Sequence, residues 1–273
     1  IITGGSPTWA YKDIAACQQE VTTSGIKSFL VECQQEVELA GNPRFTLDAI
    51  KIAKEQIQHP LPQSALPEQL QNIKGLSVWA LPRPAQPYAG YTDCAEGVGI
   101  DSTATMIGET LTGRHVCTLE DNDRNPNVHA AIVAKLLRWY NDPLYGWERE
   151  KAGDLPAVIA AEGYTKVYWH SREQTSNQLR AGVEPSKMRG YPMNQTTKKT
   201  LIDRFATSIE TFAFSSPSER FWEQAEHYII TKDNTTEAEA GYHDDLIYAG
   251  AGFIMLCEQP GAKTLRQTPR LTP

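Results

Sequence analysis

The chain has 273 residues, of which 40% are hydrophobic and 22% are charged, an ordinary globular composition that allows one main domain plus an appendage. No apolar run is long enough to span a membrane and no signal peptide opens the chain, so we expect a soluble cytoplasmic protein without a membrane partner. The formal charge of −7 argues against binding of nucleic acid through overall charge, but not against an enzyme that contacts DNA locally. Five scattered cysteines without CxxC spacing favour neither a disulfide framework nor a zinc site.

Residues 1–60 are predicted to form a small helical segment, because apolar residues such as Ile14, Cys17 and Val21 recur at mixed helical spacing. The chain opens on Ile1 without an initiator methionine, and we therefore expect a fragment of a longer protein. Residues 61–87 are rich in proline, which breaks helices, and we interpret them as a linker wrapped on a domain surface.

From residue 88 the sequence alternates between strand and helix patterns. The predicted elements are, in order, strands over 88–93, 102–109 and 114–119, a helix over 127–140, a strand over 144–147, a helix over 154–163 and a strand over 165–169. The first three strands are predicted to be antiparallel, and the later ones need crossover connections. This order predicts an α/β fold with a mixed sheet flanked by helices.

The C-terminal third is predicted to be mainly helical. A polar stretch over 170–197 shows no clear period, and we interpret it as a substrate-facing loop. Helices are then expected over 198–210, 218–227 and 243–257, and residues 259–273 are interpreted as a loose basic tail. Trp147, Trp169 and Trp222 are expected to be core residues rather than base-stacking platforms.

Acidic residues stand at conspicuous places in this pattern. Asp93 and Glu148 each follow a short apolar or aromatic strand, and Asp244 and Asp245 open an otherwise apolar helix. A half-buried carboxylate costs free energy unless it is paired, hydrogen-bonded or bound to metal. Hard cations such as Mg²⁺ prefer oxygen ligands, and two or three carboxylates from separate elements are enough to hold them. The joint placement predicts a site for one or two divalent cations.

Each acid also has an ordinary structural interpretation. Asp93 is compatible with a turn residue, and Glu148 with a surface pair to Arg149 or Lys151. Asp244 and Asp245 are compatible with a helix N-cap and a first-turn acid that the helix dipole favours. No single acid decides between these interpretations, and both stay open.

Taken together, the motifs resemble the C-terminal nuclease domain of the large terminase subunits of tailed bacteriophages. The resemblance covers roughly residues 88–257, and the motifs that carry it are Tyr91-Thr92-Asp93-Cys94-Ala95-Glu96-Gly97 with Asp101 beyond, Trp147-Glu148-Arg149, Gly163-Tyr164, Gly190 with Thr197-Lys198, and Gly241-Tyr242-His243-Asp244-Asp245. It implies an RNase H-like nuclease domain over 88–258. It also implies cleavage of concatemeric viral DNA during packaging in the host cytoplasm.

The resemblance implies roles for individual residues. Asp93, Glu148 and Asp245 resemble a catalytic, metal-binding triad that uses Mg²⁺ or Mn²⁺, with Asp244 as the other candidate of its pair and Asp101 as an accessory ligand. The partners it implies are double-stranded DNA, a terminase small subunit and a capsid portal. Basic residues near the site and on the borders of the polar stretch are expected to contact DNA phosphates, or else to form a solvated face: Arg149, Lys151, Lys187, Arg189, Lys198 and Lys199.

The segments Ile1–Thr8 and Phe29–Gln34 resemble the end of the same family's ATPase domain. No phosphate-binding loop of the form G-x-x-x-x-G-K-[ST] occurs, so no ATPase activity is expected from this chain alone. A free-standing helical domain over 1–60 is the alternative.

Two alternative functions stay open. One is an RNase H-like resolvase or recombinase nuclease, and the other is a non-catalytic docking module of a packaging motor. The helical and proline-rich segments before Asp93 favour the terminase over the resolvase.

Overall fold

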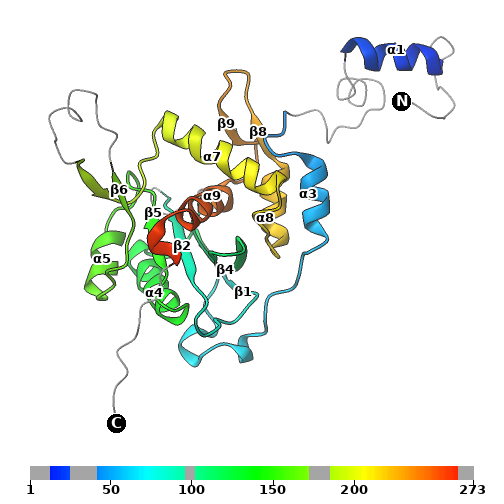
Figure 1. The fold of residues 1–273 in the computed structure, drawn as a ribbon. Helices are drawn as coiled ribbons and strands as arrows, with labels where there is room; N and C mark the ends of the chain where they lie inside the picture. The colour runs from blue at the N-terminus through cyan, green and yellow to red at the C-terminus, as the bar shows by residue number, and fades with distance from the viewer. Residues whose placement is uncertain (1–12, 25–41, 96–101, 172–184, 264–273) are drawn as a thin grey trace.

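The computed structural model describes residues 13–24, 42–95, 102–171 and 185–263 (Figure 1). Asp101, the segments Ile1–Thr8 and Phe29–Gln34, and most of the expected tail over 259–273 lie outside the described residues. Among the described residues, no helix is both long and apolar enough to cross a membrane.

A five-stranded mixed sheet forms the centre of the fold, with the strand order β1-β4-β3-β2-β5. Its strands are β1 (Leu76–Val78), β2 (Tyr88–Asp93), β3 (Thr103–Glu109), β4 (Arg114–Asp121) and β5 (Leu144–Trp147). Strands β2, β3 and β4 pair antiparallel, whereas β5 pairs parallel to β2. The prediction of an α/β fold with a mixed sheet is therefore confirmed.

Helices cover both faces of the sheet, which explains why its central strands are apolar on both sides (Figure 1). Consecutive side chains of β2 point to opposite cores: Tyr88 packs in the core with α4 (Pro126–Trp139) and α5 (Leu155–Ala161), and Ala89 packs in the core with α9 (Asp245–Cys257). The other helices of the α9 core are α3 (Leu47–Lys54), α7 (Gln195–Glu210) and α8 (Glu219–Glu226).

Helix α9 packs directly against β2 because it carries a glycine at the contact. A Cβ atom placed on Gly252 would lie 2.3 Å from ring atoms of the buried Tyr91. The close approach of helix and strand therefore depends on the missing side chain. It also fixes the first turn of α9, with Asp245, relative to the end of β2, with Asp93.

The proline-rich segment over 61–87 differs from a simple surface linker. It contains two short 3₁₀ turns, Gln63–Ala65 and Glu68–Leu70, and it also supplies β1, which pairs antiparallel with β4 at the edge of the main sheet. Leu70 and Val78 of this segment are buried. The segment is thus partly integrated into the domain, because its alternate apolar residues complete one of the two cores.

Two small hairpins lie outside the main sheet. The predicted strand over 165–169 is shorter and displaced: Val167 forms a parallel bridge with Tyr145, and the strand proper is β6 (Trp169–Ser171), which pairs with β7 (Lys187–Arg189). A second hairpin, β8 (Tyr228–Ile230) with β9 (Thr236–Ala238), lies in a region without a predicted element. Helix α1 (Ile14–Ser24) and the 3₁₀ helix Pro260–Lys263 are the remaining described elements.

The three tryptophans that were expected in the core fall into two groups. Trp147 and Trp222 are buried, as expected, but Trp169 on β6 is 47% exposed. The expectation that Trp169 is a core residue is therefore wrong. Its strand belongs to a two-stranded hairpin and not to the covered five-stranded sheet.

Candidate functional site

Asp93 is the last residue of β2, and its backbone pairs with Ala104 of β3. Only 8% of its surface is exposed. The Asp93 carboxylate therefore lies at the C-terminal end of an inner strand, in a sheet that is covered on both faces. A residue paired in the ladder is not the turn residue of the ordinary interpretation.

Glu148 directly follows β5, the parallel neighbour of β2. Its backbone N–H donates to the carbonyl of Thr92 at 3.0 Å, which fixes the two strand ends beside each other. The side chain is 5% exposed. Arg149, one of the two partners expected for Glu148, pairs with Glu150 instead, at 2.7 Å.

Asp244 and Asp245 lie at the start of α9. Asp244 occupies the N-cap position but makes no capping hydrogen bond with its side chain. Instead, Gln224 of α8 accepts a hydrogen bond from the N–H of Leu246 at 2.9 Å. Asp245 is 6% exposed and belongs to the first turn. Neither carboxylate is thus used as a side-chain cap.

These four acids line one small cavity of about 110 Å³. Its lining also includes two lysines and a tyrosine of α9, and the residues are Asp93, Cys94, Ala95, Glu148, Lys151, Met193, Lys198, Asp244, Asp245 and Tyr248. The structure therefore brings together acids that are separated by as many as 152 positions, the distance from Asp93 to Asp245 along the chain.

The electrostatics of the cavity favour protonated or metal-bound carboxyls. Burial raises the pKa of Asp93 well above its usual range, and repulsion from Glu148, the hydrogen bond between these two carboxyls and repulsion from Asp245 raise it further. Burial also raises the pKa of Glu148, although the hydrogen bond with Asp93 and the positive charge of Lys151 act in the opposite direction. Crowded, desolvated carboxylates of this kind are stabilised by protons or cations.

The donor set suits a hard divalent cation. All four acids offer carboxylate oxygens, and Asp93 and Glu148 share a hydrogen bond. Across the described part of the chain, no three His, Cys, Asp or Glu side chains are already arranged around a point where a metal would bind. The carboxyl groups of Asp93 and Glu148 share a hydrogen bond instead. We therefore expect these two side chains to rotate when a metal binds.

The basic residues predicted to contact DNA occupy three environments. Lys151 and Lys198 line the carboxylate cavity itself, and the Lys198 ammonium lies 4.6 Å from the centre of the Tyr248 ring. Arg149 and Lys199 are engaged in ion pairs with Glu150 and Asp203. The remaining two, Lys187 and Arg189, are exposed on β7.

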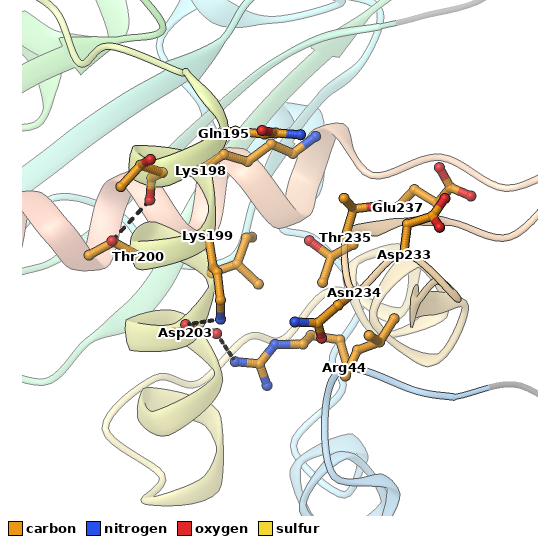
Figure 2. A pocket seen from close by; sticks show the side chains of 14 residues that line it. Arg44, Gln195, Lys198, Lys199, Thr200, Asp203, Asp233, Asn234, Thr235 and Glu237 are labelled. Atoms are coloured by element: carbon orange, nitrogen blue, oxygen red, sulfur yellow. Dashed lines mark hydrogen bonds and ion pairs between the residues drawn. The ribbon is translucent and has the colours of Figure 1, made fainter.

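A wider cavity of about 790 Å³ adjoins the carboxylate cavity, and Lys198 lines both. It lies between α7 and the loop of the β8–β9 hairpin, as Figure 2 shows. On its floor, Lys199 and Arg44 both approach Asp203, at 2.8 and 2.6 Å. Asp233 and Glu237 stand on the hairpin side, so this cavity has mixed charge.

Sequence reasoning did not identify Tyr248 or the β8–β9 hairpin. Tyr248 lies three positions after Asp245, which places both on one face of a helix, so the spacing offered a usable signal. For the hairpin, the Asp233-Asn234 pair after the short apolar run Tyr228–Ile230 was the signal for a turn.

Comparisons with known proteins identify the fold. No family model and no curated protein sequence matches the chain. The large terminase nuclease from thermophilic phage G20c with bound cobalt matches with a TM-score of 0.55 and 15% identity, over 78% of this chain and 97% of that chain. The same nuclease with bound magnesium gives 0.53 and 16%, over the same shares.

The large terminase nuclease domain of Thermus Phage P74-26 matches with a TM-score of 0.53 and 15% identity, over 75% of this chain and 93% of that chain. At such identities the likeness establishes the fold. The expected RNase H-like fold of a large terminase nuclease domain is therefore confirmed.

Proposed function

We propose that this chain is a divalent-metal-dependent endonuclease that hydrolyses phosphodiester bonds of duplex DNA, and that it cuts concatemeric viral DNA during genome packaging. The observation that carries the proposal is the convergence of Asp93, Glu148 and Asp245 from β2, β5 and α9 on one cavity. The fold shared with large terminase nucleases supports it.

In this proposal Asp93, Glu148 and Asp245 hold one or two Mg²⁺ or Mn²⁺ ions, and Asp244 is a further ligand. Bound there, the cations supply charge neutralisation for the phosphate and lower the pKa of a water molecule. The protein holds two of the ligands on adjacent strands and the third on a helix packed against them. The buried walls limit the access of water and strengthen electrostatic interactions inside the cavity.

Lys151 and Lys198 are proposed to bind the phosphates of the cleaved strand, since both line the cavity beside the carboxyls. Such contacts position the backbone without reading bases. Lys198 lies over the ring of Tyr248, which limits the positions that its long side chain adopts. A terminase small subunit and a capsid portal are the proposed partners in packaging, and no ATP hydrolysis by this chain is part of the proposal.

The test is a plasmid-nicking assay with Mg²⁺ or Mn²⁺. Asp93→Asn, Glu148→Gln and Asp245→Asn each remove a ligand charge while keeping the side-chain size. We expect each to lower the rate at least about a hundredfold, since even the outer partners of metal ligands contribute about 10–100-fold. Asp233→Asn, which removes an acid from the adjacent cavity, is the matched control and keeps the wild-type rate.

Cleavage that persists in any of the three ligand variants, or that ignores a chelator, would contradict the proposed mechanism. A wild-type chain that binds metal but never cuts DNA would favour the docking module instead.

A further inference from the structure

The β6–β7 hairpin has two faces of different character. In its register, Trp169 pairs with Arg189, His170 with Met188, and Ser171 with Lys187. Cross-strand partners share a face and successive residues alternate between faces. Trp169, Ser171, Lys187 and Arg189 therefore lie on one face, whereas His170 and Met188 lie on the other.

The His170 face is turned toward the body of the domain. The His170 ring packs edge-on against Tyr191 with 5.5 Å between ring centres, and its Nδ1 lies 3.2 Å from the hydroxyl of Tyr168. Met188, which shares this face, is 45% exposed. All four residues of the opposite face are exposed, and this face is called the outer face. This outer face consists of an indole, a hydroxyl and two cations.

The outer face is cationic on an acidic chain. Lys187 and Arg189 have no ion pair with any acid that the structure describes, although the chain carries a formal charge of −7. The Arg189 guanidinium lies 5.0 Å from the centre of the Trp169 ring. Trp169 keeps 47% of its surface exposed. An exposed indole beside unpaired cations offers stacking and charge together.

The hairpin is fixed to the strand that carries Glu148. The N–H of Tyr191 donates to the carbonyl of Trp147 at 2.8 Å, and the N–H of Arg149 donates to the carbonyl of Tyr191 at 3.0 Å. Gly190 makes this contact possible, because a Cβ atom there would lie 2.8 Å from Nε1 of Trp147. Arg189 thus stands two residues, or roughly 7 Å of strand, from the position opposite Glu148.

We propose that this outer face binds a single-stranded stretch of the DNA that enters the carboxylate cavity, with a base stacked on Trp169 and phosphates on Lys187 and Arg189. The proposal rests on the proposed function, which brings DNA to the neighbouring cavity. Unpaired bases expose a ring face to an indole, whereas the bases of an intact duplex are already stacked on each other. The cations favour a polyanion over a neutral protein surface.

The test measures fluorescence anisotropy of a labelled single strand and of the blunt duplex of the same sequence, both with chelator so that no cleavage occurs. We expect Trp169→Ala to weaken single-strand binding about tenfold, equal to about 1.4 kcal/mol, with little effect on the duplex. Trp169→Phe retains an aromatic ring and most of the affinity. Arg189→Gln lowers the affinity and makes its dependence on the logarithm of salt concentration shallower by about 0.7.

Two matched controls lie elsewhere on the surface. Leu111→Ala removes an exposed apolar side chain from the turn between β3 and β4, and Lys135→Gln removes an exposed cation from α4. Both are expected to bind the single strand like the wild type. Circular dichroism of each variant separates lost binding from lost folding.

Several outcomes overturn the proposal. These are wild-type affinity in Trp169→Ala, an equal loss for duplex and single strand, or absence of single-strand binding by the wild-type chain. A Trp169 variant that binds DNA normally but loses a protein partner would instead assign the face to protein docking. The two proposals fail separately. Cleavage by Asp93→Asn contradicts the proposed nuclease mechanism. Unchanged single-strand binding by Trp169→Ala contradicts only the proposed binding of DNA by the outer face.

Discussion

Asp93 and Glu148 are held in a setting that ordinary surface acids avoid, because each is almost fully buried and the two repel each other. Their position was predictable from sequence, since each follows a run of apolar or aromatic residues that had to be a strand. Which residues surround them was not predictable in the same way. Lys151, three positions after Glu148, was expected near the site, whereas Lys198 reaches the cavity from α7. The exposure of Trp169 follows from its place in a two-stranded hairpin outside the main sheet.

The raised pKa of Asp93 predicts how the stability of the metal-free chain changes with pH. The folded state holds the proton more tightly than the unfolded state, so this contribution is fully present below the unfolded pKa. It is lost as the pH rises toward the folded pKa, by about 1.4 kcal/mol per pH unit for one group within that window. Chemical denaturation in chelator is expected to show that Asp93→Asn removes this loss.

Divalent cations should reverse the trend, because they bind the deprotonated carboxyls. Mn²⁺ is therefore expected to raise the melting temperature more at pH 8 than at pH 5.5, and to have little effect on Asp93→Asn at either pH. An equal shift at both pH values, or an equal shift in the variant, would contradict the metal assignment of Asp93.

At the scale of elements, helix α9 joins the third ligand to the sheet. The order of strands and helices from residue 88 onward was predictable, because strands buried on both faces and amphipathic helices have distinct patterns. Strand β1 and the two hairpins were not predicted, since three-residue strands give almost no periodicity. The prolines around β1 also favoured a linker, and only its pairing with β4 reveals its place at the edge of the sheet.

Gly252→Ala tests the packing of α9 on β2. The new Cβ atom would overlap the Tyr91 ring, and overpacking of this kind costs about 3 kcal/mol, against about 1 kcal/mol gained in helix propensity. We expect a net loss of about 2 kcal/mol in the free energy of unfolding, together with slower cleavage, because Asp245 moves with the helix. Denaturation and nicking assays measure the two effects.

Gly261→Ala is the matched control for this change. A Cβ atom there would meet Leu144 at 3.8 Å, an ordinary contact. The control is expected to keep both stability and activity. A Gly252 variant as stable and active as this control would contradict the proposed coupling of α9 to the site.

At the scale of the whole molecule, an acidic chain is proposed to act on an acidic polymer. The formal charge of −7 includes the acids of the carboxylate cavity, and cations bound there reduce their repulsion of DNA. Affinity then depends on a few local cations rather than on overall charge. The negative net charge and the clustered basic residues were visible in the sequence. Which of these basic residues line the cavity depends on the fold.

The salt dependence of duplex binding tests this local view. Lys198→Gln is expected to weaken duplex binding at low salt and to make its dependence on the logarithm of salt concentration shallower by about 0.9, the contribution of one phosphate contact. Lys135→Gln on α4 is the charge-matched control and should leave the slope unchanged. Equal effects of the two substitutions would indicate that overall charge, and not the cavity, sets the affinity.

Asp93, Glu148 and Asp245 are proposed to form one divalent-metal site. The most direct measurement is an anomalous difference map from crystals grown with Mn²⁺. We expect a peak with carboxylate oxygens of all three residues at about 2.1 Å, and its loss in Asp93→Asn. A map without a peak in this cavity, or with Mn²⁺ bound by a different set of acids, would contradict it.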